Sequence, residues 1–243
     1  MGYRIPAFEL RPYMNVVELA KTRVMPLTGQ PYSFDMTPYF EEPCRFLDAV
    51  ASTCRVVISA PSQSGKSEIM LNFVAHIAIY DPAPSLLIMD TSNNSYKFSS
   101  GRVKPLLRDF VKLPAFEDTS ISNRNDDKKK AVSEYSLSNN SPLYIGGSVS
   151  LSDLCSKPCK YLVLDELARF YEGKEGSSVD LALKRQMRFR GMALLTSTPT
   201  VADNYITQYW RSGTAQTWGV ICPDCGKWFT CFYDKIIYDD VTE

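Results

Sequence analysis

The stretch SAPSQSGKSEIMLNF, residues 59–73, limits the possible folds of this chain more than any other segment. It follows the phosphate-binding Walker A pattern G-x-x-x-x-G-K-S/T, except that Ala60 stands where the first glycine is expected. A working loop needs a buried strand before it and a helix after it, because backbone N–H groups and the helix dipole must converge on phosphate. Ala60 suits such a loop if its backbone stays extended, because only a positive φ requires glycine.

Both flanks of this loop have the required pattern. The run RVVISA (55–60) is apolar and β-branched, which is typical of a strand in a parallel sheet covered on both faces. After the loop, apolar residues recur at helical spacing until Asp81 and Pro82, where we expect the helix to end. These residues are Ile69, Met70, Phe73, Val74, Ile77 and Ala78.

Further strand patterns alternate with helices along the chain. They are SLLIMD (85–90), YLVLDE (161–166), MALLTST (192–198) and, around the turn signal SNNSP, AVSEYSL (131–137) and PLYIGGSV (142–149). One more helix is expected from about Thr37 and Pro38 to Val50. This alternation predicts an α/β domain with a mostly parallel central sheet and helices on both faces.

Composition narrows the class of protein. The 243 residues carry a formal net charge of zero, which argues against a chain that coats nucleic acid through general positive charge. No apolar run is long enough to span a bilayer, and the opening MGYRIPAFEL lacks the apolar core of a secretory signal. Seven cysteines in irregular spacing fit reduced thiols. A cytoplasmic protein is therefore expected.

The run YLVLDE supplies the groups that hydrolysis needs beside a phosphate loop. Its apolar residues carry Asp165 to the end of a buried strand, where its carboxylate can hold Mg²⁺ together with the Ser67 hydroxyl. Glu166 follows and can activate the attacking water as general base. Taken alone, the acid pair could equally cap a helix N-terminus, and the loop upstream favours the catalytic reading.

The run LLTSTPT (194–200) is a strand that ends in hydroxyl side chains. Thr196, Ser197 and Thr198 are candidates to sense the γ-phosphate or the attacking water and to report its loss to the rest of the domain. The same residues are also an ordinary strand exit. Their position after the loop and the acid pair favours the sensing role.

Five segments, in this order, resemble a known family: FDMTPYFEEPCRFL, APSQSGKSEIMLNF, YDPAPSLLIMDTS, GGSVSLSDLCSKPCKYLVLDELARF and TSTPT. They are similar to the ATPase domain of the bacteriophage terminase large subunit, in its lambda-like branch, over roughly residues 30 to 230. The resemblance implies a P-loop NTPase of the RecA-like (ASCE) three-layer fold. It also implies an ATPase motor that uses ATP and Mg²⁺ to move double-stranded DNA into a procapsid in the host cell cytoplasm.

The resemblance implies further parts and partners. The partners are a portal ring, a small terminase subunit and further copies of the chain in a ring. The first thirty residues carry scattered prolines and aromatics with no clear period, so an arm or linker with one short helix is expected at 1–33. The ATPase domain is expected at 34–220, and a zinc-knuckle-like segment at 221–243. This last segment would lead toward a C-terminal nuclease, so nuclease activity is expected only in that further part.

The resemblance also assigns roles to single residues. Phosphate and nucleotide contacts fall on Ser62, Gln63, Ser64, Gly65, Lys66 and Ser67. Tyr39 would border the adenine, although a tyrosine at the start of an apolar helix is as often plain core. Ser67 and Asp165 would hold Mg²⁺, Glu166 and Lys66 would act in catalysis, and the hydroxyl residues 196–198 would couple hydrolysis to movement.

Two features depart from the pattern. Many related motors have an arginine inside the loop where this chain has Ser62, so another arginine must face the γ-phosphate, from a neighbouring subunit or from Arg102, Arg188 or Arg190 of this chain. The run CPDCGKW is a zinc-knuckle pattern in which Cys222 and Cys225 supply two ligands, with Cys231 as a possible third. We expect a half-site here, with zinc held only in the full-length protein.

Two other classes of function are compatible with parts of this pattern. A helicase or other nucleic-acid translocase shares the loop and the acid pair, but DELARF lacks the further Asp or His of the D-E-A-D/H pattern. A non-catalytic DNA-binding module with a vestigial loop is the second alternative. The intact Lys66, Ser67, Asp165 and Glu166 argue against loss of function.

Overall fold

The computed structural model describes residues 12–48, 54–113, 132–150, 157–170, 172–173, 176–189, 191–201 and 203–230. The central sheet contains β1 (Arg55–Ser59), β2 (Ser85–Met89), β3 (Val132–Ser136), β4 (Pro142–Gly147), β5 (Tyr161–Asp165) and β8 (Met192–Ser197). Two-residue strands form two small hairpins, β6 (Glu172–Gly173) with β7 (Gly176–Ser177) and β9 (Val220–Ile221) with β10 (Trp228–Phe229).

The α-helices are α1 (Val16–Lys21), α2 (Glu41–Arg45), α3 (Lys66–Tyr80), α4 (Ser92–Phe98), α6 (Ser178–Lys184) and α7 (Tyr205–Arg211). Short helical segments complete the set: η1 (Phe34–Met36), η2 (Pro38–Phe40), η3 (Ser99–Val103), η4 (Leu106–Val111), η5 (Ser148–Ser150) and η6 (Leu167–Arg169). Among these described helices, none combines the length and the apolar character needed to cross a membrane.

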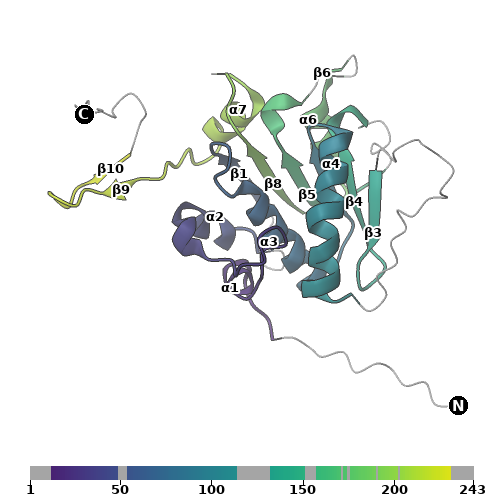
Figure 1. Ribbon diagram of the computed structural model, residues 1–243. Helices are drawn as coiled ribbons and strands as arrows, with labels where there is room; N and C mark the ends of the chain where they lie inside the picture. Colours follow the sequence, from purple (N-terminus) through teal and green to yellow (C-terminus); the bar gives the residue numbers. More distant parts are fainter. Residues whose placement is uncertain are drawn as a thin grey trace, which may run out of the picture.

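The strand order of the sheet is β1-β8-β5-β2-β4-β3 (Figure 1). The first five strands are parallel, and β3 pairs antiparallel with β4 at one edge. Parallel strands end at a common edge of the sheet, and ligands of such sheets bind at that edge. The strands β1, β8 and β5 are neighbours, so the three predicted motifs that follow them lie side by side.

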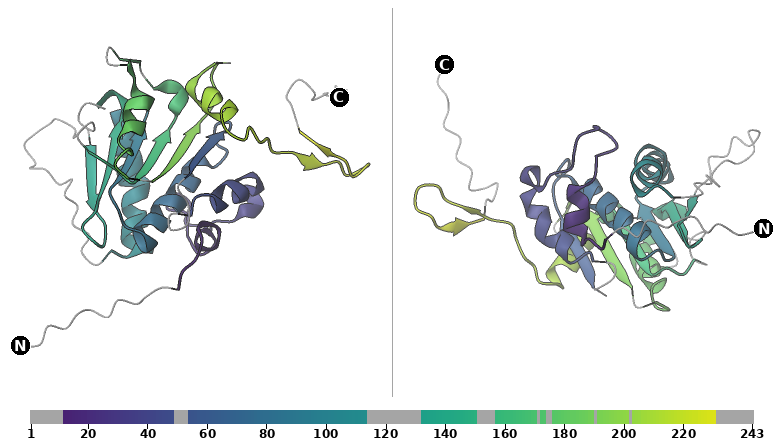
Figure 2. Two further views of the ribbon diagram at one scale, coloured as in Figure 1. Left: turned by 180° about the vertical axis from the view of Figure 1, so that it is seen from behind. Right: turned by 90° about the horizontal axis from the view of Figure 1, so that it is seen from below.

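Helices cover both faces of the sheet (Figure 2). One hydrophobic cluster joins α1, α3 and η4 to one face, which receives Leu87 and Met89 of β2. A second cluster joins α6 and α7 to the opposite face, which receives Leu86 and Ile88 of the same strand. Successive strand residues point to opposite faces, so a wholly buried strand such as β2 serves both clusters. The predicted three-layer α/β fold is confirmed.

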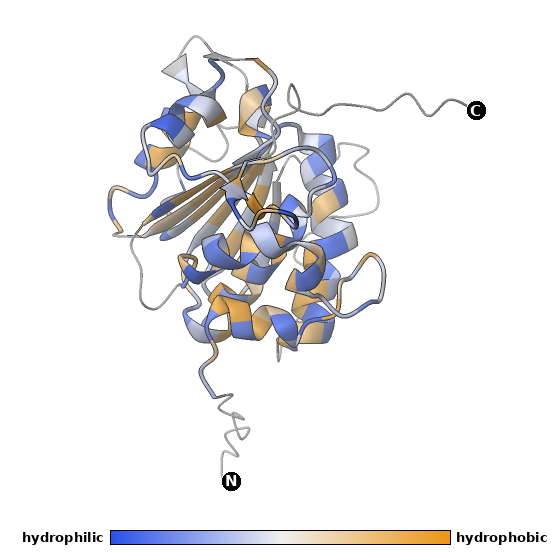
Figure 3. Cartoon of the chain, turned by 90° about the vertical axis from the view of Figure 1, so that its left-hand side faces the viewer, coloured by the Kyte–Doolittle hydropathy of each residue, from blue (hydrophilic) through white to orange (hydrophobic). Residues whose placement is uncertain are grey.

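The strands and α3 form the apolar interior of the molecule. In Figure 3 the central strands are largely orange and lie between helices of mixed blue and orange. The helix α3 is buried from Ile69 to Ala78, and it ends at Tyr80 before Pro82, as the sequence predicts. The loop at the start of α3 is therefore fixed to the most buried helix of the described chain.

The N-terminal part contributes to this core before residue 34. Asn15 and Glu18 form a capping box at the start of α1, in which each side chain accepts a hydrogen bond from the backbone N–H of the other residue. Val16 and Leu19 are buried in the same cluster as α3. The expected arm at 1–33 thus includes a packed helix, and the division at residue 33 stays a prediction.

The prediction of one continuous helix from Thr37 onward is wrong. The structure has the 3₁₀ turn η2 followed by the short helix α2. Pro43 explains the break, because a proline cannot donate to the carbonyl four residues earlier and its ring clashes with that carbonyl. A continuous α-helix from Pro38 through Pro43 is therefore excluded.

Gly191 precedes β8 at a close approach between two segments. A Cβ built at this position lies 1.7 Å from the Lys160 carbonyl oxygen. We expect Gly191→Ala to lower the free energy of unfolding by about 2 kcal/mol or more, because the backbone on both sides must shift. Urea unfolding measures this change.

The control for this substitution is Gly101→Ala. Gly101 lies in the helical segment η3, and a Cβ there meets no atom within 4 Å. This variant should keep or gain stability, by about 0.5–1 kcal/mol. Equal stabilities of the two variants would contradict the close approach at Gly191.

Candidate active site

The loop between β1 and α3 has the backbone that the Walker A pattern predicts. Gly65 has φ 97° and ψ 9°, a left-handed conformation that favours glycine, and Gln63 has φ 60°. Ala60 is not among the described residues with positive φ, and its N–H donates to Ser197 O at 3.1 Å. The alanine in place of the first glycine therefore fits the loop without strain.

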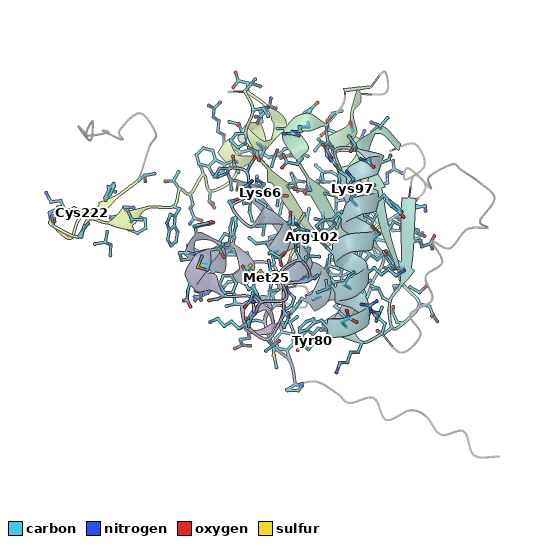
Figure 4. The ribbon with its side chains drawn as sticks, in the orientation of Figure 1. Met25, Lys66, Tyr80, Lys97, Arg102 and Cys222 are labelled. Atoms are coloured by element: carbon cyan, nitrogen blue, oxygen red, sulfur yellow. The ribbon has the colours of Figure 1, made fainter. Side chains whose placement is uncertain are left out.

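Lys66 is the first residue of α3, and the residue is 6% exposed. Its ammonium donates to the carbonyl oxygens of Ala60 (3.0 Å) and Pro61 (2.8 Å) and to Thr198 Oγ1 (2.9 Å). Burial lowers the pKa of Lys66, and the negative charges of Glu166 and Asp165 act in the opposite direction. The lysine therefore stands at the sheet edge between its own loop and the end of β8 (Figure 4).

Asp165 ends β5 and pairs in register with Thr196 of β8. Thr196 Oγ1 donates to Asp165 Oδ1 at 2.7 Å, and both residues are buried. Burial raises the pKa of Asp165 to about 6, although the hydrogen bond from Thr196 favours the ionised form. Among the described residues no ion pair includes this carboxylate. A buried carboxylate of this kind fits a cation as its partner.

Glu166 follows β5 in a left-handed conformation, with φ 55° and ψ 44°. Its carboxylate accepts from Thr198 N at 3.4 Å and from Thr198 Oγ1 at 3.5 Å. Thr198 therefore contacts both the lysine of the loop and the second acid of the pair. The structure brings together Lys66, Asp165, Glu166 and Thr198.

The three hydroxyl residues at the end of β8 have different surroundings. Thr196 is fully buried against Asp165. Ser197 is also buried, and its hydroxyl accepts from Ala168 N (3.0 Å) and donates to Thr198 O (3.1 Å). Ser197 meets the loop through its backbone carbonyl at Ala60 N. Among the described residues, Thr198 is the one of the three whose side chain reaches the loop, where its hydroxyl lies 3.5 Å from Ser62 Oγ.

The loop is also fastened to the N-terminal segment. Tyr39 donates from its hydroxyl to Ser64 O at 2.9 Å. A Cβ on Gly65 would lie 3.2 Å from the Thr37 methyl carbon. Ser64 Oγ is buried without a hydrogen-bond partner among the described residues, so the loop keeps a polar group available for a ligand. These features fit the loop's predicted task of binding phosphate.

A cavity of about 450 Å³ lies beside this segment, along the outer edge of β1. Its lining includes Tyr39, Arg55, Tyr209 and Trp218. The rings of Tyr39 and Trp218 meet edge to face, with centroids 6.1 Å apart. Tyr39 therefore links the cavity to the phosphate loop.

Arg102, one of the predicted arginine candidates, lies near the start of α3 but is engaged. Its guanidinium is 3.6 Å from Glu68 Oε1 and lies over the Phe98 ring at 5.9 Å from the centroid. Glu68 also pairs with the buried Arg23 at 2.6 Å, and Arg23 donates to Asn72 Oδ1 at 2.7 Å. The sequence analysis missed this network, because Arg23 and Glu68 lie 45 residues apart with no shared pattern.

Arg188 lies at the other edge of the sheet. It belongs to the turn after α6, in which Gln186 donates to Lys160 O and Met192 O at the beginnings of β5 and β8. A strand of this length separates that edge from Lys66 by roughly 15–20 Å. At that distance Arg188 does not reach the site of its own chain. Its role as an arginine finger that serves the site of a neighbouring subunit stays a prediction. Arg190 lies outside the described residues.

Arg169 is a second residue that the sequence analysis missed. It ends η6, three residues after Glu166, and its N–H donates to Glu166 O at 2.8 Å. The signal was present in the run DELARF, where a cation stands three residues after the acid pair. The local pattern alone did not distinguish it from an ordinary surface arginine.

The predicted zinc half-site lies on the hairpin of β9 and β10, which projects away from the body (Figure 1) and far from Lys66 (Figure 4). The N–H groups of Cys225 and Asp224 and the Cys225 thiol lower the pKa of Cys222 through hydrogen bonds. The described residues contain no cluster of three metal-ligating side chains, and Cys231 lies outside them. Zinc binding in a longer protein stays a prediction.

Comparisons with known proteins agree with this geometry. Residues 28–243 match the family model of the phage terminase large subunit gpA, ATPase domain. The large terminase ATPase domain of Thermus phage P74-26 is 17% identical, with a TM-score of 0.53 over 86% of this chain and 83% of that one. Among curated proteins, no sequence matches this chain.

A second solved structure, the large terminase of bacteriophage HK97, is 10% identical with a TM-score of 0.60. The match covers 83% of this chain but 41% of that one, so this chain spans less than half of the HK97 protein. At these identities the two structures support the fold alone, and the family model covers most of the chain. The chain therefore belongs to the family of the phage terminase large subunit ATPase domain, the ATP-hydrolysing motor of DNA packaging.

Proposed function

We propose that this chain binds Mg-ATP at the common edge of β1, β8 and β5 and hydrolyses it to drive double-stranded DNA into a procapsid. The observation that carries the proposal is the linked set of Lys66, Thr198 and Glu166 beside the buried Asp165. The loop supplies donors for phosphate, and the acid pair supplies a metal ligand and a base. Together they are the parts that phosphoryl transfer to water requires.

Lys66 acts first by binding phosphate. In the structure its three N–H groups have three oxygen partners, and phosphate oxygens are acceptors of the same kind with a full charge. Ser67, with Asp165, would hold Mg²⁺, which neutralises charge on the β- and γ-phosphates. A phosphate anion beside Lys66 would favour its charged form, as the carboxylates of Glu166 and Asp165 do.

Glu166 acts as the general base. A water in line with the γ-phosphate gives its proton to the carboxylate while its oxygen bonds to phosphorus and the bond to the ADP oxygen breaks. Thr198 orients this carboxylate through its N–H and hydroxyl. Because Thr198 also contacts Lys66, it is our choice among residues 196–198 for coupling hydrolysis to movement.

Tyr39 borders the adenine in this proposal. Its hydroxyl holds the loop at Ser64, and its ring lines the aromatic cavity beside β1. A flat, mostly apolar base suits a cavity with aromatic walls and a few polar groups. Ser62 and Gln63 contribute loop backbone and side chain on the phosphate side.

The wider assignments rest on the family. We propose that the domain acts in the host cell cytoplasm with a portal ring, a small terminase subunit and further copies in a ring. Residues 34–220 form the ATPase domain in this proposal, and 221–243 lead toward a nuclease with zinc at Cys222 and Cys225. A neutral chain makes DNA contact depend on local surfaces and on assembly.

The test is Mg-ATP hydrolysis by the wild type and by Glu166→Gln at increasing protein concentration. The substitution keeps the size of the side chain and its contact with Thr198 but removes the base. We expect turnover to fall by about 10²–10⁴-fold while ATP still raises the melting temperature. A wild type that shows neither turnover nor a shift with Mg-ATP would refute the proposal.

A further inference from the structure

Arg169 is held at the edge of the site by a fixed turn. Leu167 and Phe170 on either side are buried, whereas Arg169 itself is exposed. The turn starts at Glu166 directly after β5 and is closed by the bond from Arg169 N to Glu166 O, and the bond from Ala168 N to Ser197 Oγ ties it to β8. The backbone that carries this arginine is thus held between the end of β5 and the strand β8.

The charge of Arg169 reaches the phosphate loop. Its guanidinium is one of the charged groups that act on the pKa of Lys66, which it lowers, whereas the carboxylates of Glu166 and Asp165 raise it. Among the residues that the structure describes, no ion pair or side-chain hydrogen bond engages this guanidinium. Its donors therefore remain available to a ligand.

Among the charges of the chain itself, Lys66 is opposed by the two carboxylates of Asp165 and Glu166. The Mg²⁺ that would be held at Asp165 offsets part of this negative charge, and Arg169 adds a second fixed cation from the protein. A fixed cation also stabilises the charge that spreads over the γ-phosphate oxygens in the transition state.

Other described arginines near the loop are less suited. Arg102 is paired with Glu68, and Arg23 is fully buried on the same carboxylate. Arg188 lies beyond the opposite edge of the sheet, near the beginnings of β5 and β8. Arg169 differs from all three because it lies at the edge of the sheet where β5 and β8 end, and because its guanidinium has no ion pair among the described residues.

We propose that Arg169 contacts the γ-phosphate of ATP bound in its own subunit and stabilises its transition state. This inference rests on the proposed function, because it needs ATP at Lys66. It replaces the loop arginine of related motors, whose place Ser62 takes here. The site then carries its own arginine and does not depend on a neighbouring subunit for this charge.

The first test compares Arg169→Ala, Arg169→Lys and Arg108→Ala. Arg108 is an exposed arginine of η4 that pairs with Asp109 away from the site. We expect Arg169→Ala to lower kcat by about 10²–10³-fold with KM for ATP changed only a few-fold, and the lysine variant to recover part of the loss. Turnover of Arg169→Ala equal to that of Arg108→Ala would overturn the proposal.

A binding measurement decides the point without turnover. Beryllium fluoride with Mg-ADP mimics the γ-phosphate, so the wild type should bind this complex more tightly than Mg-ADP. Arg169→Ala should keep its affinity for Mg-ADP and lose most of the added affinity for the fluoride complex. An unchanged increment in Arg169→Ala would overturn the role, whereas a wild type that binds neither ligand would refute the nucleotide site itself.

Mixing two inactive variants tests whether the arginine acts within its own subunit. Glu166→Gln carries an intact Arg169, and Arg169→Ala carries an intact Glu166. If each site uses its own arginine, the mixture should stay as inactive as the separate variants. Recovery of turnover on mixing would show that Arg169 serves the neighbouring site and would overturn this assignment.

Discussion

Lys66→Ala should lower Mg-ATP turnover by about 10²–10³-fold or more, because it removes the buried cation that we propose binds the phosphates. In the structure this ammonium makes three hydrogen bonds within the site, and alanine leaves the carbonyls of Ala60 and Pro61 without that donor. The variant should also lose the rise in melting temperature that ligand binding gives. Hydrolysis and thermal unfolding, each with and without Mg-ATP, measure both effects.

The matched control is Lys97→Ala. Lys97 is also a helical lysine, but it is exposed on α4 and lies apart from the loop (Figure 4). It should keep both the turnover and the thermal shift of the wild type. A Lys66→Ala protein that still gains the full thermal shift would contradict the placement of phosphate at this lysine.

Asp165→Asn should abolish Mg-dependent turnover and, measured without nucleotide, make the protein more stable. The Asp165 pKa is about 6 in the folded protein against an ordinary value of 3.8, so ionising this group costs more in the folded state. At neutral pH its charge therefore lowers the free energy of unfolding by roughly 1–3 kcal/mol. Asparagine removes the charge and still accepts the hydrogen bond from Thr196.

The raised pKa of Asp165 also predicts how the stability difference between Asp165→Asn and the wild type changes with pH. A raised pKa contributes stability below about pH 4, and this contribution is lost as the pH rises to about 6. Asp165→Asn should therefore gain most over the wild type at pH 7.5 and little at pH 4, in urea unfolding. Asp203→Asn is the control, because Asp203 is 81% exposed in a surface pair with Arg211. Asp203→Asn should change the free energy of unfolding by less than about 1 kcal/mol.

An Asp165→Asn variant that is less stable than the wild type at pH 7.5 would show that burying the charged Asp165 carboxylate does not destabilise the fold, and would contradict the prediction.

The local patterns of the sequence predicted the elements that carry the site. Four apolar residues before Asp165 predict the strand β5, because a strand buried on both faces has a continuous apolar run. The Walker A loop before Lys66 predicts the start of the helix α3. The elements β1, α3, β2, β5 and β8 are therefore confirmed. The three-layer class followed from their alternation.

The strand order and the contacts between residues far apart in the sequence could not be predicted from these local patterns. The insertion of β8 between β1 and β5 sets which hydroxyl meets which acid, and no local period encodes strand order. Thr198 reaches Lys66 across 132 residues of sequence, and Arg23 reaches Glu68 across 45. The expected helix after Thr37 failed for a local reason, since the pattern of apolar residues was weighed above Pro43.

The insertion of β8 also determines when the site can form during folding. The loop strand β1 and the acid strand β5 do not pair with each other, since both pair with β8, which is the last strand of the central sheet along the chain. During synthesis the loop and the acid pair therefore emerge long before the strand that brings them together. Such a late, long-range pairing carries the largest loop-closure cost and forms slowly. Nucleotide binding should thus appear only after residue 198 has been added, so an incomplete chain on the ribosome cannot consume ATP.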